Sequence, residues 1–146
     1  MKIISDIRLY KSTELNNHID IGNKEINIAV RRVVMKLREY GCSLGEFDHL
    51  YLNFTTAKPK EAFELIDKAD PHHPWYRYCD IGVTRIEYEN LTTQLVYEKI
   101  NLVLVNLFNI AEDVIQNAIT EAQKGSEMQM FFKEKKSAKA TATIFL

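Results

Sequence analysis

Cysteine and histidine side chains are the first candidates for chemistry in this sequence, because they bind metal ions and act as nucleophiles or bases. The candidates with soft ligand atoms include Cys42, His49, His72, His73 and Cys79. A zinc site needs three or four such ligands that converge, usually as closely spaced pairs. Neighbouring side chains of an extended segment point to opposite faces, so His72 and His73 are poorly placed to bind one ion. We therefore expect no metal site.

The two cysteines are also poor candidates for a catalytic thiol, which needs a neighbouring base or cation to stabilise the thiolate. Cys42 follows the predicted end of a helix, where the helix dipole disfavours an anion. Cys79 lies in a predicted strand, where a cysteine more often packs as a small apolar residue. The GxGxxG, GxxxxGK[ST], GxSxG and HExxH motifs are missing from the sequence. We expect no enzymatic activity, no cofactor and no disulfide.

Acidic and aromatic residues are concentrated between positions 61 and 80. The residues that we predict to contact a partner are Glu61, Glu64, Asp67, Asp70, Trp75, Tyr76 and Asp80. Aromatic anchors contribute much of the free energy of protein binding, and carboxylates accelerate association with a basic partner. The alternative is a solvated segment whose aromatic rings lie in the core.

The basic residues predict no nucleic-acid site. Four of them lie on one predicted helix, namely Arg31, Arg32, Lys36 and Arg38. We interpret them as a solvated helix face whose charges pair with nearby glutamates. The chain holds 19 Lys and Arg against 20 Asp and Glu, a net charge of −1. Nucleic-acid binding normally requires a basic excess, so we expect no nucleic-acid partner.

Length and composition predict one globular domain. The chain has 146 residues, of which 46% are hydrophobic and 27% charged. The first residues, MKIISDIRLYKS, place Asp6 and Arg8 inside the apolar stretch, unlike a signal peptide. The longest uncharged stretch, residues 100–111, is far shorter than the roughly 20 apolar residues that span a bilayer. We expect a cytoplasmic protein that does not contact a membrane.

Apolar spacing predicts the elements in the first half of the chain. A strand is expected at residues 3–9. A helix with Asn23 as its N-cap and Gly41 after its end is marked by a stripe of Ile26, Val30, Val33, Leu37 and Tyr40. Alternation of apolar and polar residues predicts a second strand at 48–55.

The next segment is bracketed by Pro59, Pro71 and Pro74, and its middle, residues 61–68, is predicted to form a short helix. A strand follows at residues 75–83. Within it, Gly82 is expected to mark a bulge or a close backbone approach.

The second half of the chain is dominated by helical spacing over residues 89–124. A straight helix of this length would overhang a domain of this size, so we expect a break near Asn106–Asn109 or a second subunit that covers the overhang. Strands at 127–134 and 139–146 complete the order β-α-β-β-α-β-β. We predict a single α+β domain over residues 1–146, in which a mostly antiparallel sheet is backed by two main helices.

The segments DHLYLNFTTAKP and WYRYCDIGV resemble small immunity proteins of bacterial polymorphic-toxin and contact-dependent growth inhibition systems. The residues that carry the resemblance are Leu50, Tyr51, Asn53, Phe54, Thr55, Tyr78, Asp80 and Gly82. The resemblance implies a cytoplasmic protein that binds one cognate toxin domain, often a nuclease, and neutralises it without covalent chemistry. Such families diverge at the toxin-facing surface, so no contact residue is carried over from them.

Two other classes of function are weighed against this one. The first is a small homo-oligomeric regulatory or ligand-binding domain, such as a homodimer, with the long helix at the subunit interface. The second, least favoured, is a hydrolase that uses His or Cys. A position directly downstream of a toxin reading frame would distinguish the immunity protein from both.

Overall fold

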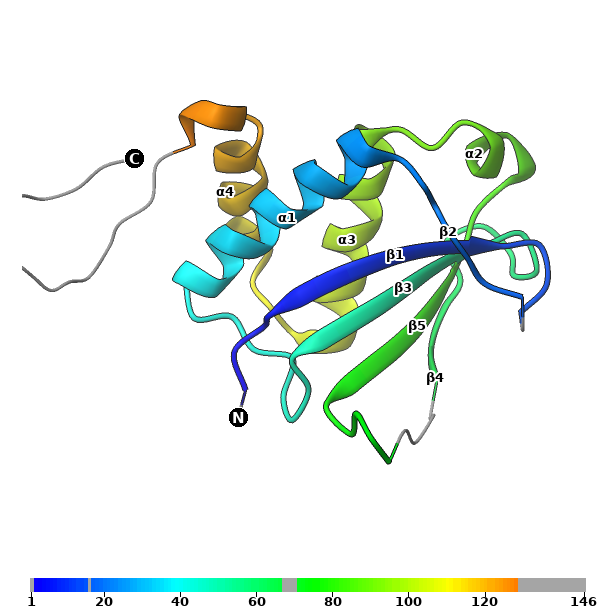
Figure 1. The fold of residues 1–146 in the computed structure, drawn as a ribbon, viewed down its shortest axis with the longest axis horizontal. Helices are drawn as coiled ribbons and strands as arrows, with labels where there is room; N and C mark the ends of the chain where they lie inside the picture. Colours follow the sequence, from blue (N-terminus) through cyan, green and yellow to red (C-terminus); the bar gives the residue numbers. More distant parts are fainter. Residues whose placement is uncertain (1, 16, 67–70, 129–146) are drawn as a thin grey trace, which may run out of the picture.

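Five strands and four α-helices follow one another in the computed structural model, which describes residues 2–15, 17–66 and 71–128 (Figure 1). In chain order they are β1 (Asp6–Ser12), β2 (Ile19–Asp20), α1 (Lys24–Glu39), β3 (His49–Thr55), β4 (Phe63–Ile66), β5 (Tyr76–Gly82), α2 (Arg85–Glu89), α3 (Thr93–Phe108) and α4 (Glu112–Ala122). A 3-10 turn, Gly125–Glu127, follows α4. The elements form one α+β domain.

The strands form a mixed sheet in the order β2-β1-β3-β5-β4. The three central strands, β1, β3 and β5, are parallel, and the short edge strands β2 and β4 are antiparallel to their neighbours. The prediction of a mostly antiparallel sheet is therefore wrong. Helix α1 carries the chain from the end of β1 back to the start of β3, and such a crossover makes the two strands parallel.

The segment predicted as a short helix, residues 61–68, instead contains the edge strand β4. Phe63 and Leu65 alternate with Glu64, and this period of two matches a strand better than a helix. Strand β4 runs antiparallel to β5 on the side away from β3, so β5 lies between two strands that precede it in the chain. Alternation over four residues is too short a signal to exclude a helical turn.

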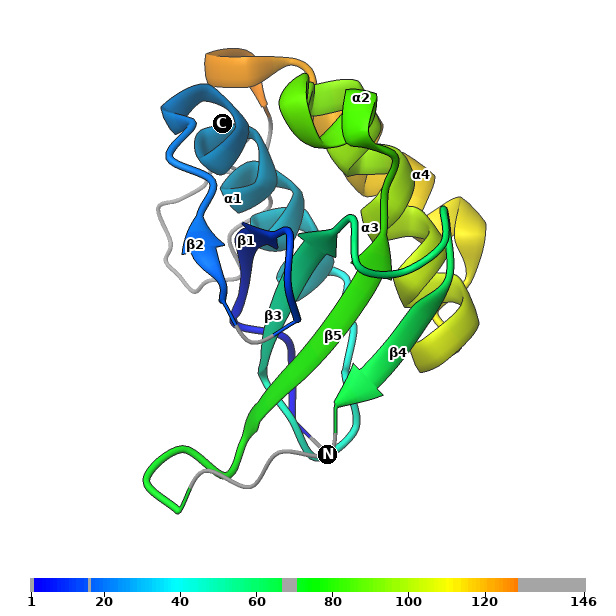
Figure 2. The ribbon, with the colours of Figure 1, turned by 90° about the vertical axis from the view of Figure 1, so that its right-hand side faces the viewer.

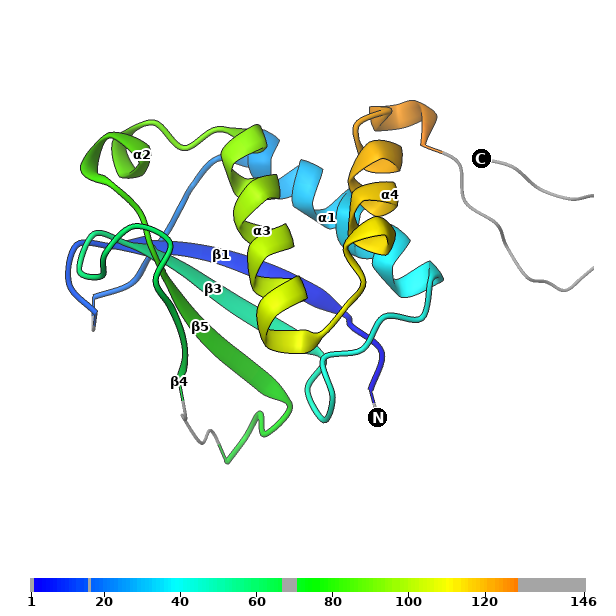
Figure 3. The same ribbon diagram turned by 180° about the vertical axis from the view of Figure 1, so that it is seen from behind.

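Three helices, α1, α3 and α4, lie on the same face of the sheet, where two main helices were expected (Figures 2 and 3). The predicted break in the long helical segment is confirmed. Helix α3 ends at Asn109, which adopts a left-handed conformation with φ 56°, and α4 begins at Glu112. The break lets α4 pack against α1 and removes the overhang that motivated a second subunit.

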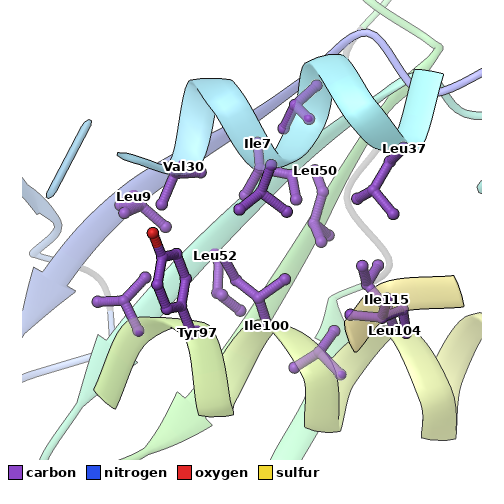
Figure 4. Packing of buried hydrophobic residues seen from close by; sticks show 14 of the residues in the cluster. Ile7, Leu9, Val30, Leu37, Leu50, Leu52, Tyr97, Ile100, Leu104 and Ile115 are labelled. Atoms are coloured by element: carbon purple, nitrogen blue, oxygen red, sulfur yellow. The ribbon is translucent and has the colours of Figure 1, made fainter. Parts of the chain in front are cut away.

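The hydrophobic core lies between this face of the sheet and the three helices (Figure 4). Leu50 and Leu52 of β3 point into it and are fully buried, as are Ile100 and Leu104 of α3 and Ile115 of α4. The predicted helix signals are confirmed too, because Asn23 accepts a hydrogen bond from the Ile26 amide and Gly41 has φ 76°.

The start of the chain differs from the prediction, and the last predicted strands lie beyond the described residues. The first strand spans residues 6–12 where residues 3–9 were expected, although Ile4 is still fully buried in the core. The predicted strands at 127–134 and 139–146 lie, beyond Met128, outside the described residues. Within the described part of the chain, no helix has the length and apolarity needed to cross a bilayer.

Candidate functional site

The face of the sheet opposite α1, α3 and α4 carries no helix among the described residues, and we call it the open face (Figures 1 and 3). Alternation along β3 turns Leu50, Leu52 and Phe54 toward the helices and turns the residues between them outward. The parallel register places the outward residues of β1, β3 and β5 side by side in rows. The open face is therefore built by three strands that are far apart in the chain.

An aromatic cluster occupies the half of the open face nearest the start of the strands. Its members are Tyr10, His49, Tyr51, His73, Trp75, Tyr76 and Tyr78. Tyr51 lies at its centre, with ring centroids 5.6 Å from Tyr10, 5.1 Å from Tyr76 and 5.0 Å from Tyr78. These separations fall in the range of favourable aromatic pairs.

The rings of the aromatic cluster are half-buried, because they shield one another and no other described element covers them. Burial raises the pKa of Tyr51 to about 12, with Arg8 acting in the opposite direction. The outer ring Tyr76 contacts His49 and His73, each with a centroid distance of 4.6 Å. The cluster is therefore a preassembled, largely aromatic surface on the open face.

Two side-chain pairs that include an acidic residue lie beside the aromatic cluster. Arg8 Nε donates to Asp6 Oδ2 at 2.9 Å, and this hydrogen bond raises the pKa of Arg8. His49 Nδ1 lies 2.7 Å from Asp48 Oδ1. Lys2 Nζ lies 5.8 Å from the Trp75 ring centroid, so the rim also carries a cation in contact with a ring of the cluster.

A row of buried polar groups joins the carboxyl-terminal halves of the three parallel strands. Asn53 Nδ2 donates to Ser12 Oγ at 3.0 Å and to Asp80 Oδ1 at 2.9 Å. Asn53 is 2% exposed and Asp80 is 3% exposed. His18 Nε2, from the segment between β1 and β2, lies 4.0 Å from Asp80 Oδ1. The Asn53 amide thus links β1, β3 and β5.

The carbonyl oxygen Oδ1 of Asn53 is buried and has no hydrogen-bond partner among the described residues. Both hydrogens of its amide are already donated to Ser12 and Asp80, so the side chain cannot turn without losing them. An unsatisfied buried acceptor costs about 1–3 kcal/mol, and a bound water is the simplest donor that would remove this cost.

The structure separates the seven predicted contact residues. Trp75 and Tyr76 belong to the aromatic cluster, and Glu64 lies on the open face of β4, opposite Asp80. Glu64 is exposed and accepts a hydrogen bond from Lys58 Nζ at 2.6 Å. Asp67 and Asp70 lie outside the described residues.

Glu61 points away from the open face. Its carboxylate Oε2 lies 3.4 Å from Nζ of Lys99, a lysine of α3 that is only 2% exposed. Glu61 also has φ 64°, in the left-handed region that non-glycine residues rarely adopt. Its side chain is 57% exposed, but its carboxylate is directed toward Lys99. Glu61 and Asp80 therefore both contact other residues of the same chain, Lys99 and Asn53 respectively.

Sequence reasoning missed Tyr10, His18 and the central position of Tyr51 as site residues. One signal was present for Tyr51: the alternation of Leu50, Leu52 and Phe54 gives β3 only one apolar core face, which leaves Tyr51 on the other. No local signal connects Tyr10 to that face, because its neighbourhood depends on the parallel pairing of β1 with β3.

The metal and thiol hypotheses gain no support from the geometry. In residues 2–15, 17–66 and 71–128, no three side chains of His, Cys, Asp or Glu converge as metal ligands would. Cys42 and Cys79 are both buried free thiols. Burial raises the pKa of Cys79 to about 12 and raises that of Cys42, which opposes thiolate formation.

Comparison of this chain with protein-family models, with curated proteins and with solved structures finds no match to any of them. The function has therefore to be argued from the fold and the open face themselves.

Proposed function

We propose that this protein binds another protein through the open face of its sheet, and that the partner is a toxin domain which it neutralises without catalysis. The observation that carries the proposal is the aromatic cluster around Tyr51, which is half-buried and has no covering element among the described residues. Clustered tyrosine and tryptophan side chains are typical of the residues that dominate binding free energy at interfaces.

A protein partner is favoured over a nucleic acid by the charges near the cluster. Arg8 is bound to Asp6, His49 to Asp48 and Lys58 to Glu64. A surface that stacks nucleic-acid bases also needs cations free to contact phosphates. Arg8 and Lys58 are thus each paired with a carboxylate, while Lys2 Nζ lies 5.8 Å from the Trp75 ring centroid; this fits an interface with a mainly apolar centre and a polar rim.

The toxin class of partner rests on the resemblance to immunity proteins. Of the residues that carry it, Tyr51, Asn53, Tyr78 and Asp80 all belong to the outward rows of β3 and β5. These residues would hold the open face in shape and supply part of its contact area. An immunity protein acts in the cytoplasm, where it would cover the active site of the toxin domain or a surface beside it.

The energetic share of the carboxylates is smaller in this proposal than the sequence alone predicts. Asp80 is buried and Glu61 is paired with Lys99, so Glu64 is the predicted acidic residue that is exposed on the open face. Aromatic contact area would therefore provide most of the affinity, and the remaining charge would mainly affect the association rate.

An immunity gene is expected directly downstream of its toxin reading frame, so the test is co-expression with the toxin domain found at that position, using Tyr51→Ala and Tyr76→Ala. Wild-type protein should rescue growth and co-elute with the toxin domain on gel filtration. Each substitution should raise Kd by about 30-fold or more, as expected for an interface hot spot. Tyr40→Ala is the matched control, because Tyr40 is an exposed ring at the end of α1 on the helical side.

Two results would overturn the proposal. The first is undiminished rescue and affinity in both aromatic variants while they remain folded by circular dichroism. The second is binding of single-stranded RNA that Tyr51→Ala abolishes, without any binding of the toxin domain, which would make the open face a base-stacking surface.

A further inference from the structure

A groove of about 830 Å³ lies on the helical side of the molecule, where α1 and α3 begin and α4 ends. Lys24 and Glu25 line it at the start of α1, and Thr93 and Gln94 line it at the start of α3. Cavities of about 300–1,000 Å³ are typical of sites for small molecules. The groove is separated from the open face by the sheet and the core.

The wall of the groove contains a tyrosine hydroxyl that has no hydrogen-bond partner among the described residues. Tyr97 of α3 is only 5% exposed, and its ring belongs to the core. Its hydroxyl is directed toward α1 (Figure 4), and it makes no hydrogen bond within the described part of the chain. The ring is buried while the hydroxyl is not among the buried unpaired atoms, so the hydroxyl is accessible from the groove that Tyr97 lines and can donate a hydrogen bond to a ligand there.

An unpaired cation lies in the same groove. Arg32 of α1 is half-buried and forms no ion pair or hydrogen bond with any described residue. Its Nη1 atom reaches the end of α4, where a Cβ on Gly125 would lie 3.4 Å from it. Burial raises the pKa of Tyr97, and the charge of Arg32 lowers it, so the two side chains are close enough to interact electrostatically.

The backbone adds positive potential to this space. Asn23 caps the amide of Ile26, and Thr92 caps the amide of Leu95. The first amides of both helices, those of residues 24, 25, 93 and 94, have no partner among the described residues and belong to the residues that line the groove. Each helix start carries a partial positive charge, which outweighs the single helix end of α4.

We propose that this groove binds a small organic anion, whose carboxylate or phosphate group is held by Arg32 and the Tyr97 hydroxyl. The apolar part of the ligand would lie against Ile28 and Ala29, which line the same wall. Lys24 and Arg32 against Glu25 leave the lining side chains with one excess positive charge. This site does not depend on the proposed function of the open face.

The experiment titrates the full-length protein with phenyl phosphate, benzoate and the neutral analogue benzyl alcohol, with affinity measured by calorimetry. The two anions identify the preferred head group, and benzyl alcohol should bind at least about tenfold more weakly. Arg32→Gln should weaken anion binding by about tenfold or more, and Tyr97→Phe by about threefold to tenfold. Arg31→Gln is the matched control, because Arg31 lines a different depression, beside Asp6 and Asp20.

The inference is overturned if wild-type protein binds none of the three compounds, or if benzyl alcohol binds as well as the anions. It is also overturned if Arg31→Gln weakens binding as much as Arg32→Gln, because that would indicate only general attraction to a basic helix. Should Tyr97→Phe fail to fold, Arg32→Gln decides the question alone, since a half-buried arginine without partners is not needed for the fold.

Discussion

The close approach at Gly82 predicts a large destabilisation for Gly82→Ala. A Cβ added at Gly82 would lie 1.7 Å from the carbonyl oxygen of Pro59 and 2.8 Å from that of Lys58, whereas ordinary contact begins at 3.4 Å. Because both obstacles are backbone atoms, the loop before β4 must move away. That movement breaks two hydrogen bonds, from the Glu61 amide to Gly82 O and from the Gly82 amide to Ala62 O.

The magnitude follows from these losses. Each backbone hydrogen bond contributes a net of about 0.5–1.5 kcal/mol to the free energy of unfolding. Two bonds therefore account for about 1–3 kcal/mol, and overpacking adds roughly 1–3 kcal/mol, so the expected total is about 2–6 kcal/mol. This is a large part of the roughly 5–15 kcal/mol by which a domain is usually stable. The change should also displace β4 and with it Glu64 on the open face.

The assay is urea unfolding followed by circular dichroism and by Trp75 fluorescence. Gly45→Ala is the control, because Gly45 has φ 82° but open space around its Cβ position. This substitution should lower the free energy of unfolding by only about 1–2 kcal/mol, the cost of holding an alanine in the left-handed conformation. If Gly82→Ala lowered the free energy of unfolding no more than Gly45→Ala does, the close approach to Pro59 would not be a feature of the folded protein.

The remaining predictions concern the core, an ion pair and pH. Leu104→Ala should lower the free energy of unfolding by about 2–5 kcal/mol, because Leu104 is fully buried. Leu107→Ala should lower it by clearly less, because Leu107 is only partly buried. Equal losses in urea unfolding would contradict this placement. Glu61→Gln should cost about 1 kcal/mol in the same assay by leaving buried Lys99 without its carboxylate, and no loss would show that the ion pair contributes nothing. Burial raises the pKa of Cys79 from 9.0 to about 12, so the folded state holds this proton longer and stability should fall as pH rises through that interval. Cys79→Ala should reduce the slope, and an unchanged slope would exclude Cys79 as its source.

Local patterns in the sequence are enough to predict most elements of this fold and one face of its best strand. The α1 boundaries follow from Asn23 and Gly41, whose roles depend only on neighbouring backbone groups. The alternation in β3 identifies Leu50 and Leu52 as core residues, because a strand exposes its two faces to different surroundings. Length alone indicated either a break in the 89–124 segment or a second subunit, and the structure has the break after α3.

Candidate site residues could be predicted where the pattern of their own segment indicates exposure. They could not be predicted where a distant segment determines what the side chain contacts. Trp75 and Tyr76 were predicted together as contact residues, and they lie side by side in the aromatic cluster because they are adjacent in the chain. The partner of Glu61 is Lys99, 38 residues away, and no local spacing encodes that contact. The groove at Arg32 and Tyr97 likewise exists only because two helix starts meet.

Strand order and direction were decided by the tertiary structure alone. Alternation shows which side chains of a strand are buried, but it is the same for a parallel and an antiparallel neighbour. Here α1 returns the chain so that β3 lies parallel to β1, and β5 enters between β3 and β4. That arrangement brings Tyr10, Tyr51 and Tyr76 into one cluster. Contacts between distant segments depend on how whole elements pack, and no short stretch of sequence carries that information.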